Sequence, residues 1–195
     1  MSSNFWQKLN YIIGIIAISI LFGVMAFAAN IEIKDLDLWL HLGMGKFILE
    51  NGYVPDKDML SCTIQGRPWI NHEWLFQVTI YTIYKIWGAL GLNYMQVSIA
   101  VITMCILLFL GYNKDRQLGT LLMLLITFVV YQSRFTHRPD LFSLLFFAIY
   151  IYILALHIDK RWSVYVLFII QVLWSNFHGF FFFGPIFVAI GLVSE

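Results

Sequence analysis

Two aspartates and a histidine stand close together directly after the first long apolar stretch of the sequence. They are Asp35, Asp37 and His41, and the spacing of Asp37 and His41 would put both side chains one helical turn apart. A carboxylate in such a place can take the proton of a hydroxyl group as a general base, and a carboxylate pair can hold a divalent cation such as Mg²⁺ or Mn²⁺. The structural alternative is that Asp35 caps the helix and Asp37 is a solvated acid in its first turn.

A cationic cluster lies between two later apolar stretches. It contains Arg134, His137 and Arg138 and ends at Pro139 and Asp140. Guanidinium groups bind phosphate through paired hydrogen bonds and stay charged at any working pH, so the cluster is a candidate phosphate receptor. The alternative is that these arginines only extend from a helix end to the membrane surface.

Two further polar clusters flank or interrupt apolar sequence. The first contains His72 and Glu73, and the second contains Asn176 and His178. Helix capping by Asn71 and a first-turn position for Glu73 explain the first cluster equally well. The second lies within apolar sequence, where polar groups are costly unless they line a cavity or meet partners; a simple helix break is the alternative.

Charged residues make up only 12% of the chain, and hydrophobic residues make up 61%. A soluble domain carries about 25% charged residues, so lipid is the expected solvent for this chain. The net charge of +1 gives no argument for binding nucleic acid. Cys62 and Cys105 lie in very different surroundings, so no bridge between them is expected and the redox compartment stays open.

These observations predict an all-α, polytopic transmembrane protein with one domain over residues 1–195. Apolar stretches at or slightly below the length needed to cross the hydrocarbon core are the expected spans. A signal peptide is the alternative for the first of them, since Ala26-Phe27-Ala28 resembles a cleavage site. The predicted spans are 11–29, 94–112, 118–132, 141–156, 162–177 and 180–193.

The polar stretch 31–73 is predicted to be an outer loop that carries an amphipathic helix over 36–50. Asp35 suits the N-cap of this helix, and Gly52 suits its end. Apolar residues recur at helical spacing, so the helix is expected to lie flat at the membrane surface. The expected membrane face consists of Leu36, Trp39, Leu40, Gly43 and Phe47.

The segment 74–87 decides how the polar clusters group. It is short and contains Lys85, which favours an interfacial or re-entrant helix over a full span. Lys8 places the N-terminus in the cytoplasm by the positive-inside rule. If 74–87 does not cross, all polar clusters lie outside; if it crosses, they scatter over both faces. The rule favours the first arrangement because it leaves these basic residues inside: Lys114, Arg116, Lys160 and Arg161.

Taken together, the motifs resemble the N-terminal region of bacterial GT-C membrane glycosyltransferases, relatives of the dolichyl-phosphate-mannose protein mannosyltransferases. The resemblance covers nearly the whole chain. It rests on Asp35-Leu-Asp37-Leu-Trp39-Leu-His41-Leu-Gly43, Gly52-Tyr-Val-Pro55-Asp-Lys-Asp58, Ser61, Pro68-Trp69, His72-Glu73-Trp74-Leu75, Arg138-Pro139-x-Leu141-Phe142-Ser143 and Trp174-x-Asn176-x-His178-Gly179.

The resemblance implies a polyprenyl-phosphate-linked sugar donor, an acidic motif at Asp35 and Asp37, and basic groups that meet the donor phosphate. Enzymes of this family are usually longer, so the chain is expected to be the N-terminal part of a larger protein. The expected place is the bacterial plasma membrane, with the active face extracytoplasmic and the acceptor unknown.

The resulting hypothesis is an integral membrane glycosyltransferase that moves a sugar to an acceptor hydroxyl. A transporter or flippase for a lipid-linked or anionic substrate, and a non-catalytic membrane subunit, are the alternatives. Asp35 and Asp37 are the expected catalytic and metal-holding residues. The expected substrate-binding residues are His41, His72, Glu73, Arg134, His137, Arg138, Asn176 and His178.

Overall fold

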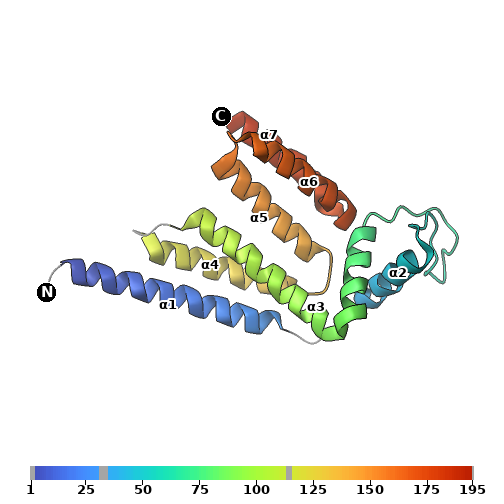
Figure 1. Ribbon diagram of the computed structural model, residues 1–195, viewed down its shortest axis with the longest axis horizontal. Coiled ribbons are helices and arrows are strands. Elements are labelled where there is room, and N and C mark those ends of the chain that lie inside the picture. Colours follow the sequence, from blue (N-terminus) through green and yellow to red (C-terminus); the bar gives the residue numbers. More distant parts are fainter. Residues whose placement is uncertain (1–2, 31–34, 113–115, 195) are drawn as a thin grey trace.

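The computed structural model describes residues 3–30, 35–112 and 116–194, and every regular element in that part of the chain is a helix (Figure 1). The all-α prediction is therefore confirmed. Residues 31–34 of the predicted outer loop and Lys114 lie outside the described residues. The elements are α1 (Ser3–Ala29), α2 (Asp37–Asn51), α3 (Trp74–Gly111), α4 (Gln117–Tyr131), η2 (Gln132–Arg134), α5 (Asp140–His157), α6 (Arg161–Phe177), η3 (Gly179–Phe182) and α7 (Phe183–Ser194).

Within the described residues, three helices are long and apolar enough to cross a membrane. They are Lys8–Ala29 within α1, Trp74–Gly111 and Asp140–His157. The helices α4 and α6 have 15 and 17 residues, whereas a straight crossing takes about 20. The last predicted span is divided between η3 and α7, because the chain makes a short 3₁₀ turn at Gly179–Phe182 before the final helix.

The predicted segments 74–87 and 94–112 are joined in one helix, α3, which is bent at Gly88. Gly88 has φ 63° and ψ −155°, a conformation that is open to glycine and strained for other residues. The two segments are separate in the sequence-based prediction, whereas in the structure no loop lies between them and the second helical part begins earlier than predicted. Figure 1 shows the first part of α3 turned away from the second and lying across one end of the other helices.

The helix predicted over 36–50 is present as α2, Asp37–Asn51. Gly52 ends it in the left-handed conformation, and its N–H donates to the carbonyl of Ile48 at 2.8 Å. Asp35 is not the N-cap, which is Leu36 and makes no side-chain capping bond. The Asp35 carboxylate instead accepts the N–H of Asp37 at 3.1 Å, just before the helix begins.

The two faces of α2 have different surroundings. The apolar face predicted from the periodicity is largely exposed at Leu36, Trp39 and Leu40, although the Trp39 ring contacts Tyr84 of α3 edge-on. The opposite face is buried and packs on the first part of α3, so apolar residues lie on both sides of this helix. The buried residues are Leu38, His41, Leu42, Met44, Gly45 and Ile48.

Two apolar clusters hold the helices together. The first joins α1, α3, α4 and α5, and Gln96 strengthens it because its buried side chain donates to the carbonyl of Ala29 at 2.6 Å. The second joins α2, both parts of α3, α5, α6 and α7 around the buried Trp174.

Much of the remaining helix surface is exposed and apolar, as expected for contact with lipid. Its most exposed members include Phe27, Phe109, Leu118, Val130, Tyr165, Phe168 and Val193.

Gly45 marks the closest approach of α2 to α3 and generates a stability prediction. A Cβ atom added there would lie 2.1 Å from the carbonyl oxygen of Gln77, which is backbone and cannot move aside easily. Gly45→Ala should therefore lower the free energy of unfolding by about 1–3 kcal/mol. The matched control is Gly43→Ala in the same helix, where nothing lies within 4 Å of the added Cβ atom. Thermal unfolding in detergent measures both, and equal melting temperatures would contradict the close contact.

The grouping of the loops generates a labelling prediction. Figure 1 shows the 52–73 loop and the η2 turn at one end of the molecule and the α5–α6 turn at the other. Exposed Cys62 should react with an impermeant maleimide from one side of the membrane. In a Cys62→Ser background, Ser133→Cys should react from that same side and Asp159→Cys only from the opposite side. Reaction of Asp159→Cys together with Ser133→Cys would refute this arrangement.

Candidate functional site

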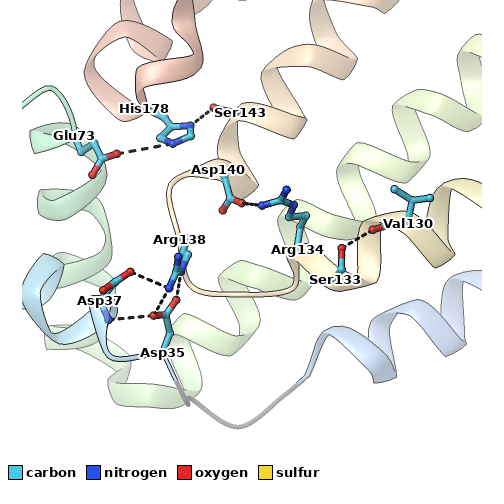
Figure 2. A network of polar contacts seen from close by, with 10 residues as sticks. All are labelled: Asp35, Asp37, Glu73, Val130, Ser133, Arg134, Arg138, Asp140, Ser143 and His178. Carbon is cyan, nitrogen blue, oxygen red and sulfur yellow. Dashed lines mark hydrogen bonds and ion pairs between the residues drawn. The ribbon is translucent and has the colours of Figure 1, made fainter.

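Four segments far apart in the sequence bring their polar side chains together at the end of the molecule that carries α2. They are the start of α2, the start of α3, the η2–α5 connection and the junction of α6 with η3, and Figure 2 shows their side chains facing one another. Glu73 and His178 come from the second and fourth segments. Most of the predicted site residues therefore do meet in space.

Arg138 holds both predicted catalytic aspartates. Its guanidinium donates to Asp35 through Nε at 2.5 Å and Nη2 at 3.0 Å, and Nη2 also lies 2.8 Å from Asp37 Oδ2. This hydrogen bonding keeps the pKa of Asp35 below its usual range and raises the pKa of Arg138. The Asp35 side chain is nearly buried, whereas that of Asp37 is 59% exposed. Asp35 is thus fixed as an anion that orients Arg138, and Asp37 keeps access to solvent.

Arg134 is less restrained by its neighbours than Arg138. Its Nη1 lies 3.4 Å from Asp140 Oδ2, a long contact, and its side chain is 64% exposed. The other oxygen of Asp140, Oδ1, is buried and has no hydrogen-bond partner among the described residues. Arg134 can therefore turn towards an incoming anion. Oδ1 of Asp140 can accept a hydrogen bond from a ligand or a water molecule.

Two adjacent cavities are lined by these groups. The first has a volume of about 580 Å³ and the second about 380 Å³. The first is walled by the start of α2 and the η2 turn, and the second extends towards Glu73, His178 and Phe180. The residues that line both are Asp37, Arg134, Arg138 and Asp140. A ligand with two chemically different ends could therefore occupy both cavities at once.

His178 is held in place by a buried chain of hydrogen bonds. Trp174 Nε1 donates to Ser143 Oγ at 2.8 Å, and Ser143 Oγ lies 2.8 Å from His178 Nδ1. On the other side of the ring, His178 Nε2 lies 3.9 Å from Glu73 Oε1. Burial lowers the pKa of His178 and raises the pKa of Glu73, so both groups are shifted towards their neutral forms.

His41 and His72 have different surroundings. His41 is buried, packs edge-on against Phe76 and contributes to the wall of the second cavity. Its Nδ1 lies 3.5 Å from the amide nitrogen of Gln77, and burial lowers its pKa. His72 is half-exposed, with its Nε2 3.7 Å from Glu73, but it lines neither of the two cavities.

Two predicted substrate-binding residues are turned away from the cavities. His137 is only 1% exposed, and its Nε2 lies 3.0 Å from Asn93 Oδ1, so it joins the η2–α5 connection to α3. Asn176 accepts the indole N–H of Trp74 at 2.7 Å and fastens α6 to the start of α3. Both side chains are occupied by these contacts, which identifies a structural role for them.

Asp140 and Ser143 are functional candidates that stood in the sequence motifs but were not predicted as site residues. Asp140 follows the predicted Arg138-Pro139 pair directly, and its position in the first turn of a helix has an ordinary explanation in the helix dipole. Ser143 lies one turn further along α5 and is fully buried. The sequence signal for Asp140 was its place at the end of the cationic cluster, and that for Ser143 was its place in the motif Arg138-Pro139-x-Leu141-Phe142-Ser143.

A cation at Asp35 and Asp37 stays a prediction, and the surroundings of this pair bear on it. No group of three or more His, Cys, Asp or Glu side chains within the described ranges 3–30, 35–112 and 116–194 is arranged to hold a metal ion. Both oxygens of Asp35 and one oxygen of Asp37 are already in contact with the guanidinium of Arg138. A cation at this pair would compete with Arg138 for these oxygens, and no chemical step below depends on a metal.

Comparisons with known proteins give no family for this chain. No protein-family model matches it, and neither the curated proteins nor the solved structures contain a match. The chemistry of the site must therefore be argued from its own geometry.

The Arg138–Asp35 contact generates a pH-dependence prediction. Because the pKa of Asp35 is lower in the folded than in the unfolded state, its contribution to stability is present above about pH 4 and is lost as the pH falls through the folded-state pKa. Asp35→Asn should lower the melting temperature at neutral pH, and the difference from the wild type should shrink in acid. The control is Asp56→Asn, at an exposed position of the 52–73 loop. A constant difference between wild type and Asp35→Asn at all pH values would contradict the ion pair.

Proposed function

We propose that this protein is an integral membrane glycosyltransferase that uses a polyprenyl-phosphate-linked sugar and acts at the extracytoplasmic face of the bacterial plasma membrane. The observation that carries the proposal is the junction of a polar cavity with an apolar groove. The sequence resemblance to GT-C enzymes supports the same class of donor.

The apolar groove runs between α3, α4 and α5 and has a volume of about 520 Å³. Ser133 and Arg134 belong both to this groove and to the first polar cavity. The remaining groove residues are almost entirely apolar and lie on helices whose outer surfaces are also apolar. They are Thr103, Leu107, Ile126, Thr127, Val130, Tyr131, Leu144, Phe147, Ala148 and Ile151.

This arrangement suits a molecule with an apolar chain and an anionic head. The chain would lie in the groove, where burial of hydrocarbon contributes about 0.8 kcal/mol for each CH₂ group. The phosphate would lie at Arg134, the cation with the weakest internal contact. The sugar beyond the phosphate would then project into the polar cavities, next to Arg138 and the carboxylates.

In the proposed reaction an acceptor hydroxyl oxygen attacks the anomeric carbon, and the bond from that carbon to the phosphate oxygen breaks. The electron pair leaves with the polyprenyl phosphate, whose added negative charge Arg134 and Arg138 stabilise. Asp35 and Asp37 keep the guanidinium of Arg138 fixed, so it need not reorganise during the reaction. Catalysis by these groups is electrostatic and requires a dry cavity, which the bilayer and the sugar help to provide.

A flippase for a lipid-linked substrate is the second candidate, and one observation favours it. Another apolar cavity of about 490 Å³ adjoins the groove, with Leu107 and Thr127 common to both, and it ends at Arg116. Apolar surface therefore follows α4 from Arg134 towards Arg116, with an arginine at each end. A lipid could move along such a path with its head group passing between the two cations.

The experiment is an assay in membranes that contain the full-length protein and a panel of labelled polyprenyl-phosphate hexoses. Val130→Trp should raise the donor KM by about tenfold or more, because an indole would fill an exposed part of the groove that the lipid chain needs. The measurement is release of free polyprenyl phosphate, which reports transfer to any acceptor.

The control is Val129→Trp, which makes the same change on the next residue of α4, also exposed but outside the groove. Equal donor KM values for the two variants would exclude the groove as the donor site. Movement of labelled donor across the membrane without release of polyprenyl phosphate would favour the flippase over the transferase.

A further inference from the structure

The proton of the acceptor hydroxyl needs a base, and the geometry of the second cavity points away from the aspartates. Arg138 contacts both Asp35 and Asp37, and its hydrogen bonds keep the pKa of Asp35 below its usual range, which makes Asp35 a weak base. On the opposite wall, Glu73 has no Lys or Arg partner in the part of the chain that the structure describes. Its side chain is 22% exposed, so it reaches the cavity while remaining largely shielded from water.

His178 faces Glu73 in a defined orientation. Ser143 Oγ accepts the indole N–H of Trp174, and its own O–H is then free to donate to His178 Nδ1. This assignment leaves the ring proton on Nε2, which points towards Glu73. The contact of the ring with Phe180, at 4.5 Å between centroids, also restrains it. The second cavity thus presents one N–H donor and one carboxylate acceptor side by side.

The separation of these two groups fits one oxygen atom of a ligand. His178 Nε2 and Glu73 Oε1 are 3.9 Å apart, too far for a direct hydrogen bond. An oxygen placed beside both can lie within about 3 Å of each. A hydroxyl group suits this place because it can donate its proton to the carboxylate and accept the N–H of the histidine at the same time.

We propose that Glu73 is the general base of the transfer and that His178 positions the acceptor hydroxyl for it. The inference rests on the proposed glycosyltransferase function and names the acceptor side of the same site. The acceptor O–H bond breaks and its proton moves to Glu73 Oε1, while the oxygen forms a bond to the anomeric carbon. The bond from that carbon to phosphate breaks, the electron pair leaves with the lipid phosphate, and Glu73 later releases its proton to water.

The charged surroundings of Glu73 support this role. The titratable groups that face it are His72, His178, Asp37 and Asp140, and burial together with the two aspartates raises its pKa. A base whose pKa is raised towards the working pH is more effective than one whose pKa is depressed. His41, Arg134 and Arg138 line the same cavity but make no ion pair with Glu73 within the described chain.

The test compares matched variants in the polyprenyl phosphate release assay over a range of pH. Glu73→Gln should lower kcat by about a hundredfold or more, with the donor KM unchanged because the groove and Arg134 are intact. The wild-type rate should fall in acid as Glu73 takes up a proton, and Glu73→Gln should lose this dependence. Glu73→Asp, which keeps a carboxylate, should recover part of the rate and retain the acid fall.

Asp37→Asn is the control at the other wall of the cavity. A general base typically contributes about a hundredfold or more to kcat, whereas Asp37→Asn should lower kcat by less than about tenfold. Melting temperatures in detergent show whether each variant is folded. A folded Glu73→Gln protein with an unchanged rate, or loss of the acid fall only in Asp37→Asn, would overturn the assignment while leaving the transferase function standing. If the wild-type protein released no polyprenyl phosphate from any of the donors, the proposed function itself would be overturned.

Discussion

The ion pairs of Arg138 with Asp35 and Asp37 are the interaction on which the site depends, because they join segments 103 residues apart in sequence. One arginine in the connection between η2 and α5 thereby fixes the start of α2 beside the η2 turn. Both cavities include Arg138 in their walls, so loss of this contact would release two of the segments that define them. A bidentate guanidinium–carboxylate pair is well suited to this task, since it fixes direction as well as distance.

Uncharged polar contacts fix the helices around that pair. The buried side chain of Gln77 contacts both His41 on α2 and Asn71 in the preceding loop, and Gln96 fastens the end of α1 to α3. Asn176 does the same for α6 and the start of α3. In a chain whose surface is largely apolar, hydrophobic burial alone discriminates poorly between alternative helix pairings when lipid is the solvent. Hydrogen bonds at defined positions supply that discrimination.

The same surroundings give the two walls of the second cavity different electrostatic character. The two carboxylates of the α2 wall are both paired with Arg138, whereas the opposite wall has a shielded glutamate and a histidine whose orientation is fixed from behind by Ser143 and Trp174. The apolar groove next to Arg134 adds a third surface, suited to hydrocarbon. A lipid-linked sugar and a hydroxyl acceptor are the substrates that we propose for these three surfaces.

The sequence by itself determined the helical class, the membrane character and the end of α2 at Gly52, since these follow from local composition, apolar length and the conformational freedom of glycine. It also identified about half of the residues that line the two polar cavities. Only the tertiary structure decided which face of α2 packs, because both faces are apolar and the choice depends on the close approach of Gly45 to Gln77. It also decided that His137 and Asn176 are occupied by structural contacts and that Arg138 lies between the two aspartates. Those outcomes depend on partners 44 to 103 residues away, and no local pattern in a sequence contains the distance between such residues.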